Sequence, residues 1–243
     1  MRSKQSGFTL VEIAIVLVII GLLLGGVLKG QELINSAKVK NFATDFRNVP
    51  LFIYGYQDKF RKLPGDMSAA DLGASMPGVC LATGLDCRAV ATVGTASNGI
   101  IEGNWYDVGG NTVNAGAATD SEAARFWQHA RAAGFASGPT DWGNANYRPL
   151  NADGGTIGFE TGVNMAVVPP VPAPFITGMT ATYYVCSDGI LGKFAKQLDA
   201  TLDNDETGTG SVRAVPTGSA RGTAAVTKVN IVDSATYIVC MAL

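Results

Sequence analysis

The most constraining feature of this sequence is an uninterrupted apolar run near its N-terminus. From Phe8 to Leu28 there are 21 residues, and Glu12 is the only ionisable side chain among them. As a helix rising 1.5 Å per residue, this run is about 31 Å long, which matches the hydrocarbon core of a bilayer. A carboxylate within such a segment costs roughly 2.5–3.5 kcal/mol on insertion scales, so we expect a functional role for Glu12.

A short basic segment precedes the run and ends in glycine. Residues 1–7 contain Arg2 and Lys4 and end at Gly7. Cleavage after Gly7 would leave Phe8 with a free α-amino group, which is a cation able to pair with the Glu12 carboxylate of its own or a neighbouring chain.

The order Gly-Phe-Thr-Leu-Val-Glu from Gly7 to Glu12, followed by the apolar run, resembles the type IV pilin and pseudopilin family. The resemblance implies that a prepilin peptidase cuts between Gly7 and Phe8 and methylates the Phe8 amine. Two other interpretations explain less. A Sec-type signal peptide has a shorter apolar core and a small-residue cleavage site, and a plain membrane anchor leaves Gly7 and Glu12 unexplained.

The resemblance also implies partners and a location. We expect a polymer of this chain with other pilin-like subunits, in which Glu12 of one subunit neutralises the Phe8 amine of the next. An inner-membrane assembly machinery would extrude it. Arg2 and Lys4 before the run favour a cytoplasmic N-terminus, with everything after Leu28 in the periplasm. The chain is therefore expected to be a single-pass inner-membrane protein that becomes an extracellular or periplasmic filament of a Gram-negative-type bacterium.

Charge and composition restrict the remaining function classes. The 243 residues carry a net charge of −2, and without Arg2 and Lys4 the balance is 16 basic against 20 acidic residues, or −4. Nucleic-acid binding requires a basic surface, so no nucleic-acid partner is predicted. The 30 glycines indicate a loop-rich domain that contains β-structure.

The pattern after the apolar run predicts an α+β fold with one long N-terminal helix. An apolar stripe with spacings of 4, 3, 4, 3 and 4 continues the helix, formed by Phe42, Phe46, Val49, Ile53, Tyr56 and Phe60. Pro50 predicts a kink, and Leu63-Pro64-Gly65-Asp66 predicts the end. We therefore expect a cleaved leader at 1–7, a transmembrane and polymerisation helix at 8–28, an amphipathic half at 29–62, and a globular head at 63–243. The head is predicted to be an antiparallel β-sheet with large loop insertions.

Local signals predict several elements within the head. A short strand is expected over 100–108, a helix over 122–133 after the cap residues Asp120 and Ser121, and another helix over 190–202. Residues 226–232 are predicted to form a hairpin with the last strand. His129 is the only histidine and has no readable nucleophile or second ligand near it, so a structural role is expected.

The four cysteines predict two disulfides. Residues 181–186 and 235–240 agree at five of six positions, and each ends in cysteine. We expect them to form two strands of one sheet joined by a Cys186–Cys240 bridge, an arrangement similar to the C-terminal disulfide of many type IV pilins. Cys80 and Cys87 lie close together without a metal-binding pattern, which favours a local Cys80–Cys87 disulfide over zinc.

An acidic segment resembles the first half of a calcium loop. Asp203, Asp205 and Thr207 alternate and are followed by Gly208, which places three oxygen ligands before a residue that permits a sharp turn. The twelfth position from Asp203 is Ala214 and not glutamate. Both a calcium site and a solvated acidic turn fit this pattern.

Three function classes follow from these features. The first is a structural subunit, major or minor, of a type IV pilus-like filament. The second is a pseudopilin of a type II secretion system, where tip-type members usually lack the glutamate that this chain has as Glu12. The third is a membrane-anchored periplasmic enzyme or ligand-binding domain. Because the sequence shows no nucleophile–base pair, we expect no enzymatic activity.

Overall fold

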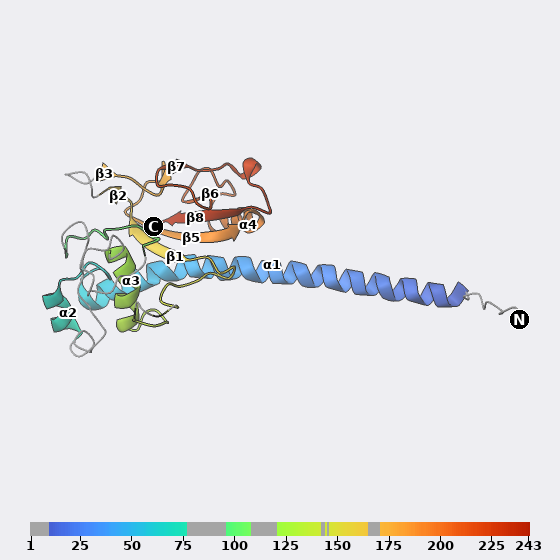
Figure 1. The fold of residues 1–243 in the computed structure, drawn as a ribbon, viewed down its shortest axis with the longest axis horizontal. Helices are drawn as coiled ribbons and strands as arrows, with labels where there is room; N and C mark the ends of the chain where they lie inside the picture. Colours follow the sequence, from blue (N-terminus) through green and yellow to red (C-terminus); the bar gives the residue numbers. More distant parts are fainter. Residues whose placement is uncertain (1–9, 77–95, 108–120, 142–143, 145, 165–170) are drawn as a thin grey trace, which may run out of the picture.

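The computed structural model describes residues 10–76, 96–107, 121–141, 144, 146–164 and 171–243. Its dominant element is α1, Leu10–Phe60, a continuous helix of 51 residues that runs the length of the described molecule (Figure 1). The head is built around the second half of α1, and the first half extends away from it (Figure 1). This arrangement confirms the predicted fold class.

The head combines short helices with a central antiparallel sheet. The sheet has the order β1-β5-β8-β6 and consists of β1 Ile157–Thr161, β5 Tyr183–Leu191, β8 Thr236–Ala242 and β6 Val212–Pro216. The helices of the head are α2 Ala69–Ser75, α3 Glu122–Ala132 and α4 Gly192–Leu202, with a 3₁₀ turn at Lys228–Asn230. Two small pairs complete the described strands, β2 Val163–Asn164 with β3 Val171–Pro172 and β4 Ile176–Thr177 with β7 Thr223–Ala224.

The predicted apolar stripe is the contact between α1 and the head. Five of its six residues are buried, and Phe60 is half-buried. The ring centroid of Phe42 lies 6.0 Å from that of Phe194 on α4. The first four stripe residues therefore form one hydrophobic core with α3, α4 and one face of the sheet, whereas Tyr56 and Phe60 pack in a separate cluster with Leu72 of α2.

After α1 the chain makes a turn that requires glycine at position 65. Gly65 has a φ of +99°, and a Cβ at this position would lie 2.5 Å from the backbone oxygen of Glu122. Since the helix ends at Phe60, the predicted stop signal at 63–66 lies immediately after it. The prediction of the helix end is confirmed to within two residues.

The two similar segments form neighbouring strands, as predicted. β5 and β8 pair antiparallel with Cys186 directly opposite Cys240, and the two cysteines form a disulfide with Cα atoms 4.0 Å apart. The register shifts after Ser187, where Gly189 has a φ of +71° and permits a bulge. The bridge ties the C-terminal strand to the centre of the sheet.

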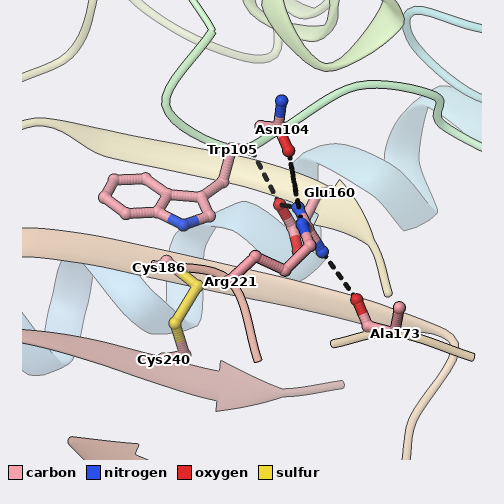
Figure 2. The surroundings of a disulfide bond; sticks show 7 residues. All are labelled: Asn104, Trp105, Glu160, Ala173, Cys186, Arg221 and Cys240. Atoms are coloured by element: carbon pink, nitrogen blue, oxygen red, sulfur yellow. Dashed lines mark hydrogen bonds and ion pairs between the residues drawn. A yellow bond between two sulfur atoms is a disulfide. The ribbon is translucent and has the colours of Figure 1, made fainter. Parts of the chain in front are cut away.

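The disulfide belongs to a second core on the sheet face opposite α1. Trp105 and Phe175 pack over it with ring centroids 5.4 Å apart. Figure 2 shows the polar contact that closes this layer, in which the buried Glu160 carboxylate accepts hydrogen bonds from the Trp105 amide and from Arg221. Arg221 also donates to the backbone oxygen of Ala173 at 2.7 Å. The Glu160–Arg221 ion pair and its hydrogen bonds therefore join β1 to the loops that contain Trp105 and Ala173.

The predicted strand at 100–108 is wrong over residues 100–107, which contain no strand. The backbone amides there bind side chains instead of a neighbouring strand. The amide of Ile101 donates to Thr161 Oγ1 at 2.7 Å, and the amide of Glu102 donates to Glu122 Oε2 at 3.1 Å. Because these backbone N–H groups already donate to side chains, they are not available for hydrogen bonds to a neighbouring strand.

Two boundaries in the C-terminal part also differ from prediction. Residues 226–232 contain the 3₁₀ turn Lys228–Asn230 and no strand. The Val226 amide donates to the Ala214 carbonyl and the Lys228 amide to Glu206 Oε1. The partner of β8 at that edge is β6, which the sequence pattern did not predict. Ile190 belongs to β5, so α4 begins two residues later than expected.

A pair of carboxyl groups is buried where α3 begins. Glu102 and Glu122 are 1% and 0% exposed, and the carboxyl group of Glu102 lies beside that of Glu122. Burial, followed by this contact, raises the pKa of Glu122 to about 10. Asp66 adds a further negative charge nearby and accepts hydrogen bonds from the amides of Asn98 and Gly99.

Replacing both bridged cysteines, Cys186→Ala with Cys240→Ala, is expected to lower the free energy of unfolding by roughly 2–4 kcal/mol. The bridge closes a segment with a sequence separation of 54, and its removal restores conformational entropy to the unfolded chain. Urea unfolding of the detergent-solubilised protein, followed by near-UV circular dichroism, measures the change. Equal urea midpoints for the variant and the wild type would contradict the expectation.

Glu122→Gln is expected to stabilise the protein increasingly as pH rises. The pKa of Glu122 is raised on folding, so the folded state keeps a proton that the unfolded state loses, and stability falls as pH rises from about 5 to about 9 by up to about 1.4 kcal/mol per pH unit. Glutamine reproduces the protonated form and removes this contribution. Melting temperatures of both proteins across this range provide the test, and parallel curves would show that the pair shares no proton.

Candidate assembly helix

The first half of α1 is an exposed apolar rod. Every residue from Leu10 to Leu28 is exposed, and Leu10 and Leu28 are 86% and 67% exposed. Among the described residues, α1 is the one helix long and apolar enough to cross a membrane. None of its most apolar part is covered by the head, so this surface is available for contact with lipid or with other helices.

Glu12 lies in the first turn of this rod. A carboxylate at a helix N-terminus interacts favourably with the helix dipole and with the amide groups exposed there. The predicted processing residues Gly7 and Phe8 lie outside the described part of the chain. The pairing of Glu12 with the amine of Phe8 therefore stays a prediction.

Glycines at Gly21, Gly25 and Gly26 leave a smooth patch on the rod. The helix is continuous through them, although glycine lowers helix stability by up to about 1 kcal/mol per residue relative to alanine. A Cβ added at any of the three would meet no atom within 4 Å. Small residues of this kind let neighbouring helices approach closely in an apolar environment.

The second half of α1 has an outward face that the sequence analysis missed. Leu51 and Tyr54 are both 62% exposed and lie away from the head, as do Leu33 and Ile34 at 62% and 61%. The sequence spacing could have indicated this face, because Leu51 and Tyr54 are three residues apart, lie on the same side of the helix and fall outside the buried stripe. The amphipathic half thus presents apolar side chains on two faces.

The structure assigns protein partners to the proposed calcium ligands. Asp203 accepts hydrogen bonds from the amides of Ser211 and Val212 at 2.6 and 3.1 Å. Asp205 forms an ion pair with Lys228. The Thr207 hydroxyl donates to the carbonyl of Val226 at 2.7 Å.

Within the described ranges, no group of three His, Cys, Asp or Glu side chains is placed to hold a metal ion. Sequence reasoning also missed Asp199, which is fully buried in the last turns of α4 beside this loop. Burial raises the pKa of Asp199 to about 6, and the charges of Asp203 and Asp205 act in the same direction. Calcium binding by Asp203, Asp205 and Thr207 stays a prediction that plays no part in the function proposed below.

The remaining candidates divide between the core and the part of the chain outside the described residues. His129 is buried on α3, where its Nδ1 accepts a hydrogen bond from the Gly65 amide at 2.8 Å. Its ring stacks on Tyr56 with centroids 6.5 Å apart. This geometry joins the end of α1 to α3, which is a structural role. Cys80 and Cys87 lie outside the described residues, so their pairing stays a prediction.

Comparison with known proteins identifies the N-terminal signal. Residues 2–28 match the family described as the prokaryotic N-terminal methylation motif. No curated protein and no solved structure shows significant similarity to the chain. The matched residues include the glycine, the phenylalanine and the glutamate that sequence analysis selected, together with the apolar run that α1 presents to its surroundings. The chain therefore carries, at residues 2–28, the prepilin-type signal of type IV pilins and pseudopilins.

Proposed function

We propose that this chain is a structural subunit of a type IV pilus-like filament, processed after Gly7 and assembled through the apolar half of α1. The observation that carries the proposal is the rod from Leu10 to Leu28, which is exposed along its whole length and has one carboxylate in its first turn. A rod of this kind needs either lipid or other rods around it, and the matched signal belongs to proteins that use both in succession.

The assembly step rests on one charge pair. After cleavage the Phe8 amine becomes available, and the Glu12 carboxylate of the adjacent subunit neutralises it within the bundle of helices. Buried ion pairs are better attested as specifying an arrangement than as adding stability. In this proposal, the pair fixes the stagger between subunits, and apolar contact supplies most of the free energy.

Location and partners follow from the same proposal. The processed subunit spans the inner membrane with its N-terminus in the cytoplasm and its head, residues 63–243, in the periplasm. A prepilin peptidase cleaves and methylates it, and an inner-membrane machinery moves it into the filament together with other pilin-like subunits. The head has a structural and not a catalytic function in this proposal.

A pseudopilin of a type II secretion system is the second candidate. The same signal and the same rod serve both systems, and the choice between them depends on where the filament ends. The large head favours the pilus. A membrane-anchored enzyme or ligand-binding domain is a weaker third candidate, because a plain membrane anchor does not require a glutamate at position 12.

Mass spectrometry of the mature protein is expected to find an N-terminus at a methylated Phe8, with residues 1–7 absent. Gly7→Leu provides the matched control, since a bulky residue at the cleavage position should leave the precursor intact in the membrane. A mature protein that retains residues 1–7 would contradict the proposal at its first step.

Glu12→Ala is expected to abolish filaments on cells while the head stays folded. The substitution removes the proposed partner of the Phe8 amine, and it lies in the part of α1 that the head does not bury. Electron microscopy of cells and the melting temperature of the purified protein are measured side by side. Normal filaments with Glu12→Ala would remove the charge pair from the mechanism.

A further inference from the structure

Two hollows lie against one side of α1, lined on the other side by residues of the head. One is a hollow of about 220 Å³ between Asp45 and Phe52 of α1 and Trp127 and Leu150 of the head. A second hollow of about 270 Å³ is also lined by Asp45 and Leu150 and extends toward Asn41. The two hollows are adjacent, because both are lined by Asp45 and Leu150, and together they are called the groove below.

The only charge that the described residues place in the walls of these hollows is a carboxylate without a partner. Asp45 is half-buried, and within the described part of the chain no hydrogen-bond donor or cation contacts its carboxylate. Burial alone raises the pKa of Asp45 to about 6. At neutral pH the group is ionised and poorly solvated, which is unfavourable for the isolated subunit.

The shape and chemistry of the groove fit a long basic side chain. Phe52, Trp127 and Leu150 supply apolar walls for an aliphatic stem, and Asp45 supplies the counter-charge. Asn48 and Ser137 add polar atoms along the groove. An arginine or lysine entering here would exchange an unpaired carboxylate for a charge-assisted hydrogen bond.

The chain offers such a side chain on a different face of the same helix. Arg47 is exposed beside Leu51 and Tyr54, and it forms no ion pair with any described residue. Residues two positions apart in a helix point in nearly opposite directions, so Arg47 does not reach the groove beside Asp45 in its own subunit. A second copy of the chain has no such restriction.

We propose that the groove beside Asp45 in one subunit receives Arg47 from a second copy of this chain, with Leu51 and Tyr54 of that copy covering the apolar rim. The contact joins two different faces, so it is heterologous, and a heterologous contact that does not close into a ring builds a helical filament. This inference rests on the proposed function, and it names the contact between heads that the apolar rods alone do not specify.

The first test separates stability from assembly with Asp45→Asn. Because the pKa of Asp45 is raised on folding, its charge destabilises the isolated subunit above about pH 6. Asparagine removes that cost, so the melting temperature of the solubilised protein is expected to rise. The number of filaments is expected to fall by about tenfold or more, because the charge pair between subunits is lost. A purely structural role would lower both quantities together, and unchanged filament numbers would overturn the proposal.

The second test exchanges the charges. Asp45→Arg alone and Arg47→Asp alone are expected to reduce filament numbers, and the combined variant is expected to restore them, because each subunit then supplies the reversed pair. Arg61→Asp is the matched control, since Arg61 is also exposed and directly follows α1 but pairs with Asp58 in its own chain. Failure of the combined variant to recover, with a head that melts normally, would contradict the pairing.

Cross-linking identifies the occupant directly. Asp45→Cys with Arg47→Cys is expected to give a ladder of multimers in oxidised cells, whereas each single variant gives no ladder. Filaments without a ladder would overturn this contact and leave the proposed function standing. Absence of both filaments and ladder from cells that express the wild type would overturn the two proposals together. A cross-linked product that mass spectrometry identifies as another protein would assign the groove to a different partner and refute the second copy.

Discussion

The structure depends on how the apolar half of α1 is kept from water. Nineteen consecutive residues, Leu10 to Leu28, leave their side chains uncovered by the head, and an apolar surface of this extent is unfavourable in water. A helix satisfies its own backbone hydrogen bonds, so the same rod is compatible with the hydrocarbon of a bilayer and with a bundle of identical rods. Passage from one environment to the other therefore requires no change in the fold of the subunit, only a change in what surrounds it.

The second half of α1 must then hold the head firmly, because the rod and the head are one continuous helix. The part of the stripe from Phe42 to Ile53 supplies this attachment by burial against α4, α3 and the sheet. The sheet is in turn fixed at its centre by the Cys186–Cys240 bridge and covered on the far face by the layer that Glu160 and Arg221 close. The head thus has a core on each side of the sheet, and only one of these two cores involves α1.

The parts of this fold that a sequence reveals are those determined by local pattern. The stripe on α1, the cap of α3 at Ser121 and the paired strands ending in Cys186 and Cys240 each have a regular spacing or a repeated segment, and each was predicted. The missed parts depend on partners far away in the chain. Residues 100–107 bind the side chains of Thr161, Glu122 and Glu160 in place of a strand, and β6 is defined by its pairing with β8. No local pattern encodes which distant carboxylate will accept a backbone amide.

Of the two acidic residues that the proposals use, one could be selected from the sequence and the other could not. Glu12 was apparent because a charge in an apolar run is unusual wherever the run lies. Asp45 was not, because an acidic residue beside an apolar stripe is ordinary until the segment near Leu150 covers it. Only the folded head makes Asp45 a half-buried carboxylate without a partner, two residues from a base that points the other way. A helix with complementary charges on two faces satisfies neither of them alone. The arrangement is costly for a protein that works singly, and it is favourable for one whose copies join face to face in an open series.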